Sequence, residues 1–102
     1  MPEESQCTAI IAYEVGQEDA ERFLDSWERA NSFLQEQEGH LSTALHQACS
    51  AHPDFRFVNI SQWENADAFR QATQSQEFRE VVGRLEAFPV HAAVYEVVRS
   101  SS

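Results

Sequence analysis

The sequence predicts an α+β fold in which helices cover one face of a four-stranded antiparallel sheet. The first observation is that segments rich in β-branched and aromatic residues alternate with segments whose apolar residues recur at helical spacing. The second is their order, β-α-β-β-α-β, which is the split βαβ or ferredoxin-like plan. The third is size, because 102 residues with 42% hydrophobic content suit one domain, residues 1–102, with a core at about 7–99 between short polar tails.

The first half of the chain contains the first two predicted strands and a long helix. A strand is expected at residues 7–15, ending before the turn residue Gly16. A helix is expected at residues 18–38, because acidic residues gather in its first turn and apolar residues follow at helical spacing. Gly39 is the expected stop of this helix, and the second strand is predicted at residues 40–49.

The second half of the chain supplies the other two strands and two short helices. A turn at residues 50–54 leads into a strand at residues 55–63. Helices are predicted at residues 65–73 and 75–87, with Asn65 and Ser75 as their N-caps, and a last strand at 90–99.

Helices on one face leave the other face of the sheet uncovered. Val58 and Ile60 are expected to point to that face, together with Val94 or its neighbours. In a chain this short, a second copy is the simplest cover. A homodimer with its two sheets face to face is therefore predicted.

Charge and cysteine content narrow the classes of partner and compartment. Seventeen acidic against seven basic residues give a formal net charge of -10, which disfavours nucleic acid and anionic membranes as partners. Cys7 and Cys49 form neither a disulfide framework nor a metal-binding spacing. The sequence has no apolar run of membrane-spanning length and does not open on a signal-peptide pattern, so a cytoplasmic location is expected.

Several common catalytic motifs are missing from the sequence. The four histidines lack zinc-site spacing, so no metal site is predicted. The three glycines stand alone, which argues against a phosphate-binding loop. No Gly-x-Ser-x-Gly motif occurs, and no histidine motif accompanies either cysteine.

The third predicted strand carries an unusual mixture of side chains on one face. Phe55, Phe57, Asn59, Ser61 and Trp63 alternate along it, so an amide and a hydroxyl interrupt an aromatic row. Asn59 and Trp63 would face one cavity from backbone positions about 13 Å apart. Their N–H groups suit a substrate oxygen or a developing oxyanion. The alternative is that Trp63 is a core aromatic and Asn59 bonds to the backbone at a bulge.

The same segment resembles a known family. Residues 57–69 (FVNISQWENADAF) are similar to the signature of antibiotic biosynthesis monooxygenase (ABM) domains, and residues 39–46 (GHLSTALH) and 75–79 (SQEFR) also fit. The resemblance covers about residues 8–98 and implies a dimeric α/β barrel built on the ferredoxin-like fold. Because this superfamily hosts several chemistries, the resemblance is more specific for fold than for activity.

Two branches of the family differ in the residues at their sites. Haem-degrading members use Asn, Trp and His at positions that here hold Ile11, Ala72 and about Val82, so haem degradation is disfavoured. The quinone-forming monooxygenases of aromatic polyketide biosynthesis share the Asn59 and Trp63 pair. They also carry a His and an Arg that match His46 and Arg79, but their Tyr at the start of the second helical region is Phe69 here, which removes a hydroxyl.

The resemblance implies a monooxygenase that oxidises a small aromatic compound, such as an anthrone, phenol or quinol, with O2 and without metal or other cofactor. Asn59 and Trp63 would donate to an oxyanion or peroxide, and His46 or Arg79 would move a proton or orient the substrate. His46 could instead face the dimer interface, where it would have no catalytic role. Phe57, Ser61, Phe69 and Trp27 would line the substrate pocket. The alternative function is a non-catalytic small-molecule-binding or stress-associated dimer of the same fold.

Overall fold

The structure, a computed structural model, describes residues 6–83 and 87–101. The first half of the described chain forms β1 (Cys7–Tyr13), the 3-10 turn η1 (Gln17–Asp19), α1 (Ala20–Leu34) and β2 (His40–Gln47). The second half forms β3 (Phe57–Trp63), α2 (Ala66–Gln74), α3 (Gln76–Val82) and β4 (Val90–Tyr95).

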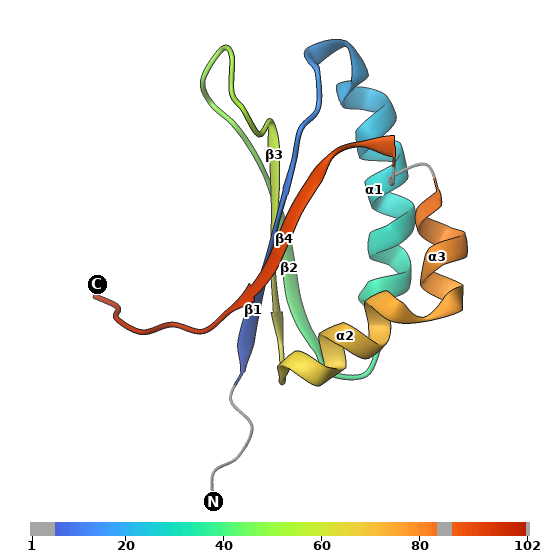
Figure 1. Ribbon diagram of the computed structural model, residues 1–102, viewed down its shortest axis with the longest axis vertical. Helices are drawn as coiled ribbons and strands as arrows, with labels where there is room; N and C mark the ends of the chain where they lie inside the picture. The colour runs from blue at the N-terminus through green and yellow to red at the C-terminus, as the bar shows by residue number, and fades with distance from the viewer. Residues whose placement is uncertain (1–5, 84–86, 102) are drawn as a thin grey trace, which may run out of the picture.

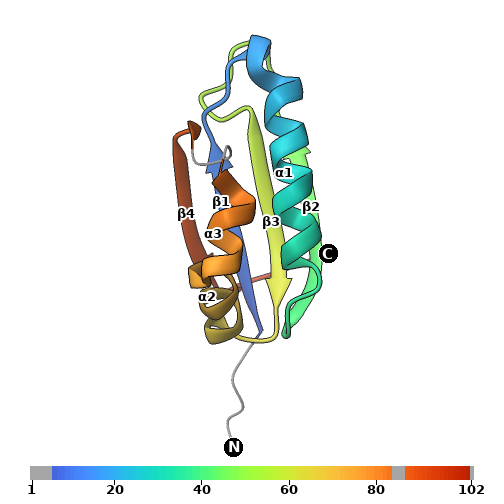
Figure 2. The same ribbon diagram turned by 90° about the vertical axis from the view of Figure 1, so that its right-hand side faces the viewer.

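The four strands form one antiparallel sheet in the order β2-β3-β1-β4. All three α-helices lie on one face of this sheet, as Figure 1 shows edge-on and Figure 2 shows with the helices in front. The predicted α+β, ferredoxin-like fold is therefore confirmed. The opposite face is open, and nothing in the described chain covers it (Figure 1).

Strand pairing decides which side chains face the helices. On β3 the alternating residues Phe57, Asn59, Ser61 and Trp63 are buried, whereas the residues between them are partly exposed. Ile60 pairs with Ile10, which places both side chains on the open face. On β4 the neighbours of Val94 lie on the open face, because Val94 itself pairs with the buried Ala9.

The core lies between the sheet and the helices and has two parts. Around the fully buried Phe23, the ring of Phe57 stacks at 4.6 Å between centroids, and Tyr13 and Phe88 approach edge-on at 4.7 and 5.4 Å. Such aromatic packing stabilises a core beyond the area it buries. The second part surrounds the fully buried Trp63 near the start of α2.

Helix α1 ends at Leu34, four residues before the predicted end. The backbone N–H of Glu36 and that of Gln37 bond to carbonyls three residues back, so the helix tightens into a turn there. Gly39 closes this turn with a φ of 92°, a conformation that glycine adopts without strain. The predicted stop residue therefore ends the turn that follows the helix and leads into β2.

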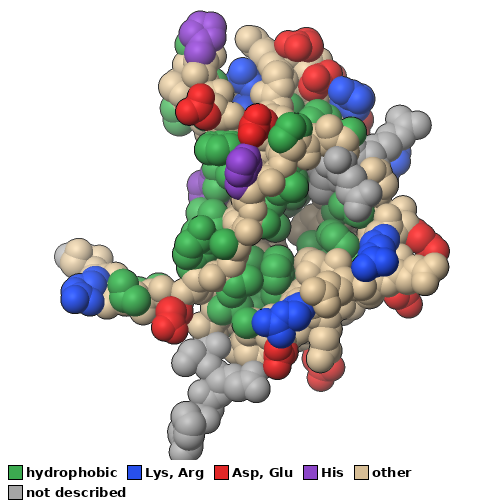
Figure 3. Space-filling model, in the orientation of Figure 1, with side chains coloured by type: hydrophobic (Ala, Val, Ile, Leu, Met, Phe, Trp, Pro, Cys, Tyr) green, Lys and Arg blue, Asp and Glu red, His purple; other side chains and the backbone are tan. Residues whose placement is uncertain are grey.

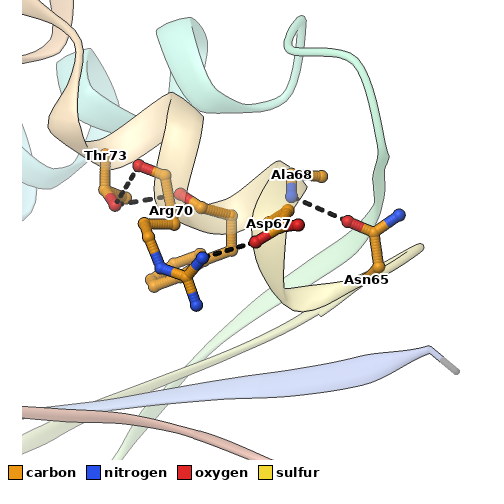
Figure 4. Close-up of polar contacts among 6 residues, drawn as sticks. Asn65, Asp67, Ala68, Arg70 and Thr73 are labelled. Atoms are coloured by element: carbon orange, nitrogen blue, oxygen red, sulfur yellow. Dashed lines mark hydrogen bonds and ion pairs between the residues drawn. The ribbon is translucent and has the colours of Figure 1, made fainter. Parts of the chain in front are cut away.

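The predicted caps of the two short helices are confirmed. The Asn65 side chain accepts the N–H of Ala68 at 2.8 Å, as drawn in Figure 4, and Ser75 accepts that of Phe78 at 3.1 Å. Helix α3 ends at Val82, earlier than predicted, and the expected helical residues 84–86 lie outside the described part.

All four strands are shorter than predicted, and β1 ends at Tyr13 instead of residue 15. β2 ends at Gln47 and β3 begins at Phe57, so the connecting loop is longer than residues 50–54. The prediction that the last strand reaches residue 99 was wrong, because β4 ends at Tyr95. The last paired residue of β4 is Tyr95, which lies opposite Thr8 near the start of β1. Residues 96–101 instead run away from the sheet on the side opposite the helices (Figure 1).

Candidate functional site

A small closed cavity lies between the sheet and the helices, beneath the face of β3 on which the sequence predicts a pocket. It encloses about 40 Å³, enough for one or a few water-sized molecules. Its polar lining residues are Tyr13, Asn31, Thr43, Asn59, Ser61, Trp63 and Thr73, and its apolar or aromatic ones are Ile11, Trp27, Ala30, Leu34, Phe69 and Phe78.

Asn59 carries a fully buried side-chain oxygen at this cavity wall. Its side chain is only 5% exposed, and its Oδ1 forms no hydrogen bond within the described part of the chain. A buried acceptor without a donor is unfavourable by about 1–3 kcal/mol. Such atoms are rare in native structures, and they occur where a ligand or water completes the bonding.

Ser61 and Trp63 form a buried hydrogen bond at the same wall. The indole Nε1–H of Trp63 donates to Ser61 Oγ at 2.9 Å. The indole N–H is therefore already used inside the protein. Because the Ser61 oxygen accepts this bond, its own O–H remains available as a donor. The pair can thus present a hydroxyl donor to the cavity, polarised by the indole behind it.

A larger apolar recess adjoins the closed cavity. It measures about 270 Å³ and is open to the surface between the helices and β4. Figure 3 shows the hollow there, with hydrophobic side chains around it. The residues shared with the closed cavity are Ile11, Tyr13, Phe69, Thr73 and Phe78, and the rest of the recess is lined by Val82, Val90 and Ala92.

Tyr13 lies between the two spaces and was not predicted from the sequence. It lines both of them, and its side chain is 6% exposed. Burial raises the pKa of its hydroxyl to about 12, so the group stays protonated near neutral pH. Tyr13 lies two residues after Ile11, so both side chains point to the same face of β1, and Ile11 pairs with Asn59. This alternation was the sequence signal that could have identified Tyr13.

Three of the four predicted pocket residues line the cavity. Trp27, Ser61 and Phe69 do so, from α1, β3 and α2 respectively. The Phe69 ring lies edge-on to Trp63 at 5.5 Å. Phe57 does not line it, because this fully buried ring is stacked on Phe23 in the core.

The predicted proton-transfer residues lie elsewhere. His46 pairs with Val58, so its exposed side chain is on the open face of the sheet, opposite the cavity. Arg79 is exposed in the last turn of α3, next to Phe78 but not among the lining residues. The structure therefore brings Asn59, Ser61 and Trp63 together, but not His46 or Arg79.

The described residues contain no cluster of three or more His, Cys, Asp or Glu that could hold a metal ion. Cys7 and Cys49 are free thiols, the first buried and the second exposed, and burial raises the pKa of Cys7. Within the described ranges, no helix is both long and apolar enough to cross a membrane.

Comparison with known proteins identifies the family. A family model described as antibiotic biosynthesis monooxygenase matches residues 7–84. The chain belongs to the ABM family. The resemblance seen in the sequence is thereby confirmed, and family membership places the protein among the monooxygenases. No curated protein is similar enough to the chain to count as a match.

Solved structures of other proteins share this fold over nearly their whole length. A candidate monooxygenase from Shewanella loihica is 28% identical, with a TM-score of 0.84 over 97% of this chain and 100% of that one. SnoaB, a cofactor-independent oxygenase from Streptomyces nogalater, is 24% identical, with a TM-score of 0.81 over 94% of this chain and 96% of its own. A conserved protein from Methanosarcina mazei is 15% identical, with a TM-score of 0.76 over 89% and 91%.

Proposed function

We propose that this ABM-family protein oxidises a small phenolic or anthrone-like compound with O2 and needs no metal or organic cofactor. The observation that carries the proposal is the buried Oδ1 of Asn59, which has no partner within the described residues; Asn59 lines the cavity together with the Ser61–Trp63 pair. The likeness to SnoaB, a cofactor-independent oxygenase, supports the same chemistry.

The two adjoining spaces suit the two parts of such a substrate. The apolar recess of about 270 Å³ favours a flat aromatic body, because burying apolar surface there is favourable. The closed cavity of about 40 Å³ suits the oxygen-bearing edge and O2. In this arrangement the substrate hydroxyl donates to Asn59 Oδ1, and Ser61 donates to a neighbouring oxygen. Asn59 would then act as an acceptor toward the substrate, whereas the sequence suggested a donor.

The reaction follows from the loss of one substrate proton. The resulting enolate or carbanion passes one electron to O2, and the radical pair combines to form a C–O bond as a peroxide. Cleavage of the O–O bond and loss of the second proton give the quinone carbonyl and one water. The protein would contribute exclusion of water and fixed donors for the oxyanion, namely Ser61 with Trp63 behind it. His46 and Arg79 remain predicted participants that would need to act from outside the cavity.

We also propose that two copies pair through the open face of the sheet. The half-buried Ile10 and Ile60 lie on that face, and the chain end that leaves on the same side carries Val97 and Val98, 73% and 75% exposed (Figure 1). Apolar surface of this kind favours association. Light scattering coupled to size exclusion should give twice the chain mass. Ile60→Glu should lower it to one chain mass, and a mass of one chain for the unmodified protein would exclude the dimer.

The activity is tested with chelator-treated protein and an anthrone such as dithranol. We expect O2 uptake and quinone absorbance to rise together, with one O2 consumed for each quinone formed. Asn59→Ala and Trp63→Phe should both slow this reaction. A rate no greater than that without protein, or one unchanged by both substitutions, would contradict the proposal.

A non-catalytic binding protein of the same fold makes a different prediction. Aromatic compounds would raise its melting temperature in proportion to their affinity, without any quinone being formed. Thermal shift and O2 uptake measured on the same samples separate the two functions.

A further inference from the structure

The proposed oxidation requires a base, and the cavity wall does not supply one. Within the described part of the chain, none of the lining residues is Asp, Glu, His, Lys or Arg. Tyr13 is the ionisable residue among them, and burial raises its pKa to about 12, so it is an acid near neutral pH. A proton leaving the substrate must therefore pass through a polar lining residue to a base behind it.

A β-bulge in β2 places His40 where it can act as this base. His40 pairs with Trp63 and Ser42 pairs with Gln62, so β2 contains one extra residue, Leu41, between them. In a regular strand His40 and Thr43 would point to opposite faces. The bulge changes the phase, so that both lie on the side of the sheet that faces the helices, as does Trp63.

Contacts in the structure agree with this placement. The His40 Nε2 lies 2.6 Å from Thr43 Oγ1, and the imidazole ring meets the Trp63 indole edge-on at 5.1 Å between centroids. Thr43 lines the cavity, whereas His40 is partly buried behind it. One hydroxyl thus separates the cavity from an imidazole.

The electrostatic setting favours the neutral imidazole. Burial lowers the pKa of His40 below its usual 6.5, so the ring is mostly unprotonated at neutral pH. Three exposed carboxylates, Glu38, Glu64 and Asp67, share a surface recess with Gly39, the residue before His40, and Asp67 is paired with Arg70.

We propose that His40 is the proton acceptor of this site and acts through the Thr43 hydroxyl. The substrate O–H or acidic C–H bond breaks and its proton joins Thr43 Oγ1, while the Thr43 hydroxyl proton moves to His40 Nε2. The imidazolium formed later returns the proton to the peroxide oxygen, so the relay consumes nothing. This assignment rests on the proposed oxidation, but its geometry can be tested without turnover.

The first test is the tautomer of His40. The relay requires a bare Nε2 that accepts from Thr43, and therefore a proton on Nδ1. Long-range ¹H–¹⁵N NMR of the intact protein with labelled histidine distinguishes the two tautomers, and His40→Gln assigns the signal. We expect the Nδ1–H form at neutral pH. An Nε2–H form would overturn the relay whether or not the protein oxidises anthrones.

The second test is kinetic. Thr43→Val and His40→Gln should each lower the dithranol kcat by about 100-fold, the usual range for general-base catalysis, with a smaller change in KM. Thr43→Ser, which keeps the hydroxyl, should restore most of the rate. His52→Gln, in the exposed loop between β2 and β3, is the matched control and should leave it unchanged.

The outcomes of the two tests separate the relay from the proposed function. An active protein whose rate survives both Thr43→Val and His40→Gln keeps the function and overturns the relay. An inactive wild type overturns the function, and the tautomer alone then decides whether His40 is set up as an acceptor. Circular dichroism of each variant establishes that the fold is retained.

Discussion

The indole N–H of Trp63 donates to the hydroxyl oxygen of Ser61 at 2.9 Å, two residues away on the same face of β3, with both side chains buried. This bond explains why serine occupies a core-facing position of a central strand. It also changes the role that we propose for Trp63, because its indole N–H is bonded to Ser61 and would reach a substrate only through that hydroxyl. The two residues should therefore behave as one unit.

The coupling between Ser61 and Trp63 is measurable. Ser61→Ala leaves the indole N–H buried without an acceptor, and we expect a loss of about 1–3 kcal/mol in the free energy of unfolding. In a double-mutant cycle with Trp63→Phe, the two effects should be non-additive by about 1 kcal/mol in urea denaturation. Additive losses would show that the bond contributes nothing to stability.

Asn59 should be needed for activity but not for the stability of the fold. Its unpaired Oδ1 is unfavourable in the ligand-free protein, so Asn59→Leu, of similar size, should leave the melting temperature unchanged or raise it. The same substitution should abolish dithranol oxidation, because the substrate hydroxyl loses its acceptor. A large fall in melting temperature would mean that the amide stabilises the fold.

Gly39 is needed for the turn between α1 and β2. Its φ is 92°, and a Cβ built there would overlap with the Cβ of Ala68 at the start of α2. Gly39→Ala should therefore lower the free energy of unfolding by about 2 kcal/mol or more. Gly83→Ala is the matched control, because no atom of the described residues lies within 4 Å of a Cβ at that position. Equal losses for the two variants would contradict this explanation.

His40 should make stability depend on pH. Its pKa is lowered in the fold, so below about 6.5 the unfolded chain binds this proton more readily than the native protein does. The stability that depends on neutral His40 is fully present above pH 6.5. It is lost as the pH falls toward the pKa of His40 in the folded protein. Urea denaturation of wild type and His40→Gln over this range should show a steeper acid loss in wild type, and parallel curves would refute it.

Tyr13 should act as a hydroxyl donor, never as a phenolate, in the neutral range. With its pKa raised to about 12, absorbance titration of a Tyr95→Phe variant should show no phenolate below pH 10. Tyr13→Phe should slow dithranol oxidation by about tenfold, as expected for one lost hydrogen bond in a closed site. An unchanged rate would leave Tyr13 as a packing residue of the core.

Much of the fold could be predicted from local chemistry. The side-chain oxygens of Asn65 and Ser75 precede short apolar repeats and cap α2 and α3, as expected from residue type alone. The ends of α1 and β4 could not be predicted in the same way. The end of α1 depends on the tightened turn before Gly39, and the end of β4 depends on how far its pairing with β1 continues, which is to Tyr95 opposite Thr8.

Local residue patterns were enough to predict the strand and helix order, the family resemblance, and the alternation that places Asn59, Ser61 and Trp63 on one buried face. Tertiary structure decided what those residues contact. In the folded protein the Trp63 N–H donates to Ser61, and Asn59 Oδ1 has no partner within the described residues. His46 lies on the open face of the sheet. The physical reason is that a one-residue bulge reverses the facing of a strand, so His40 comes to lie behind the cavity and simple alternation cannot foresee it.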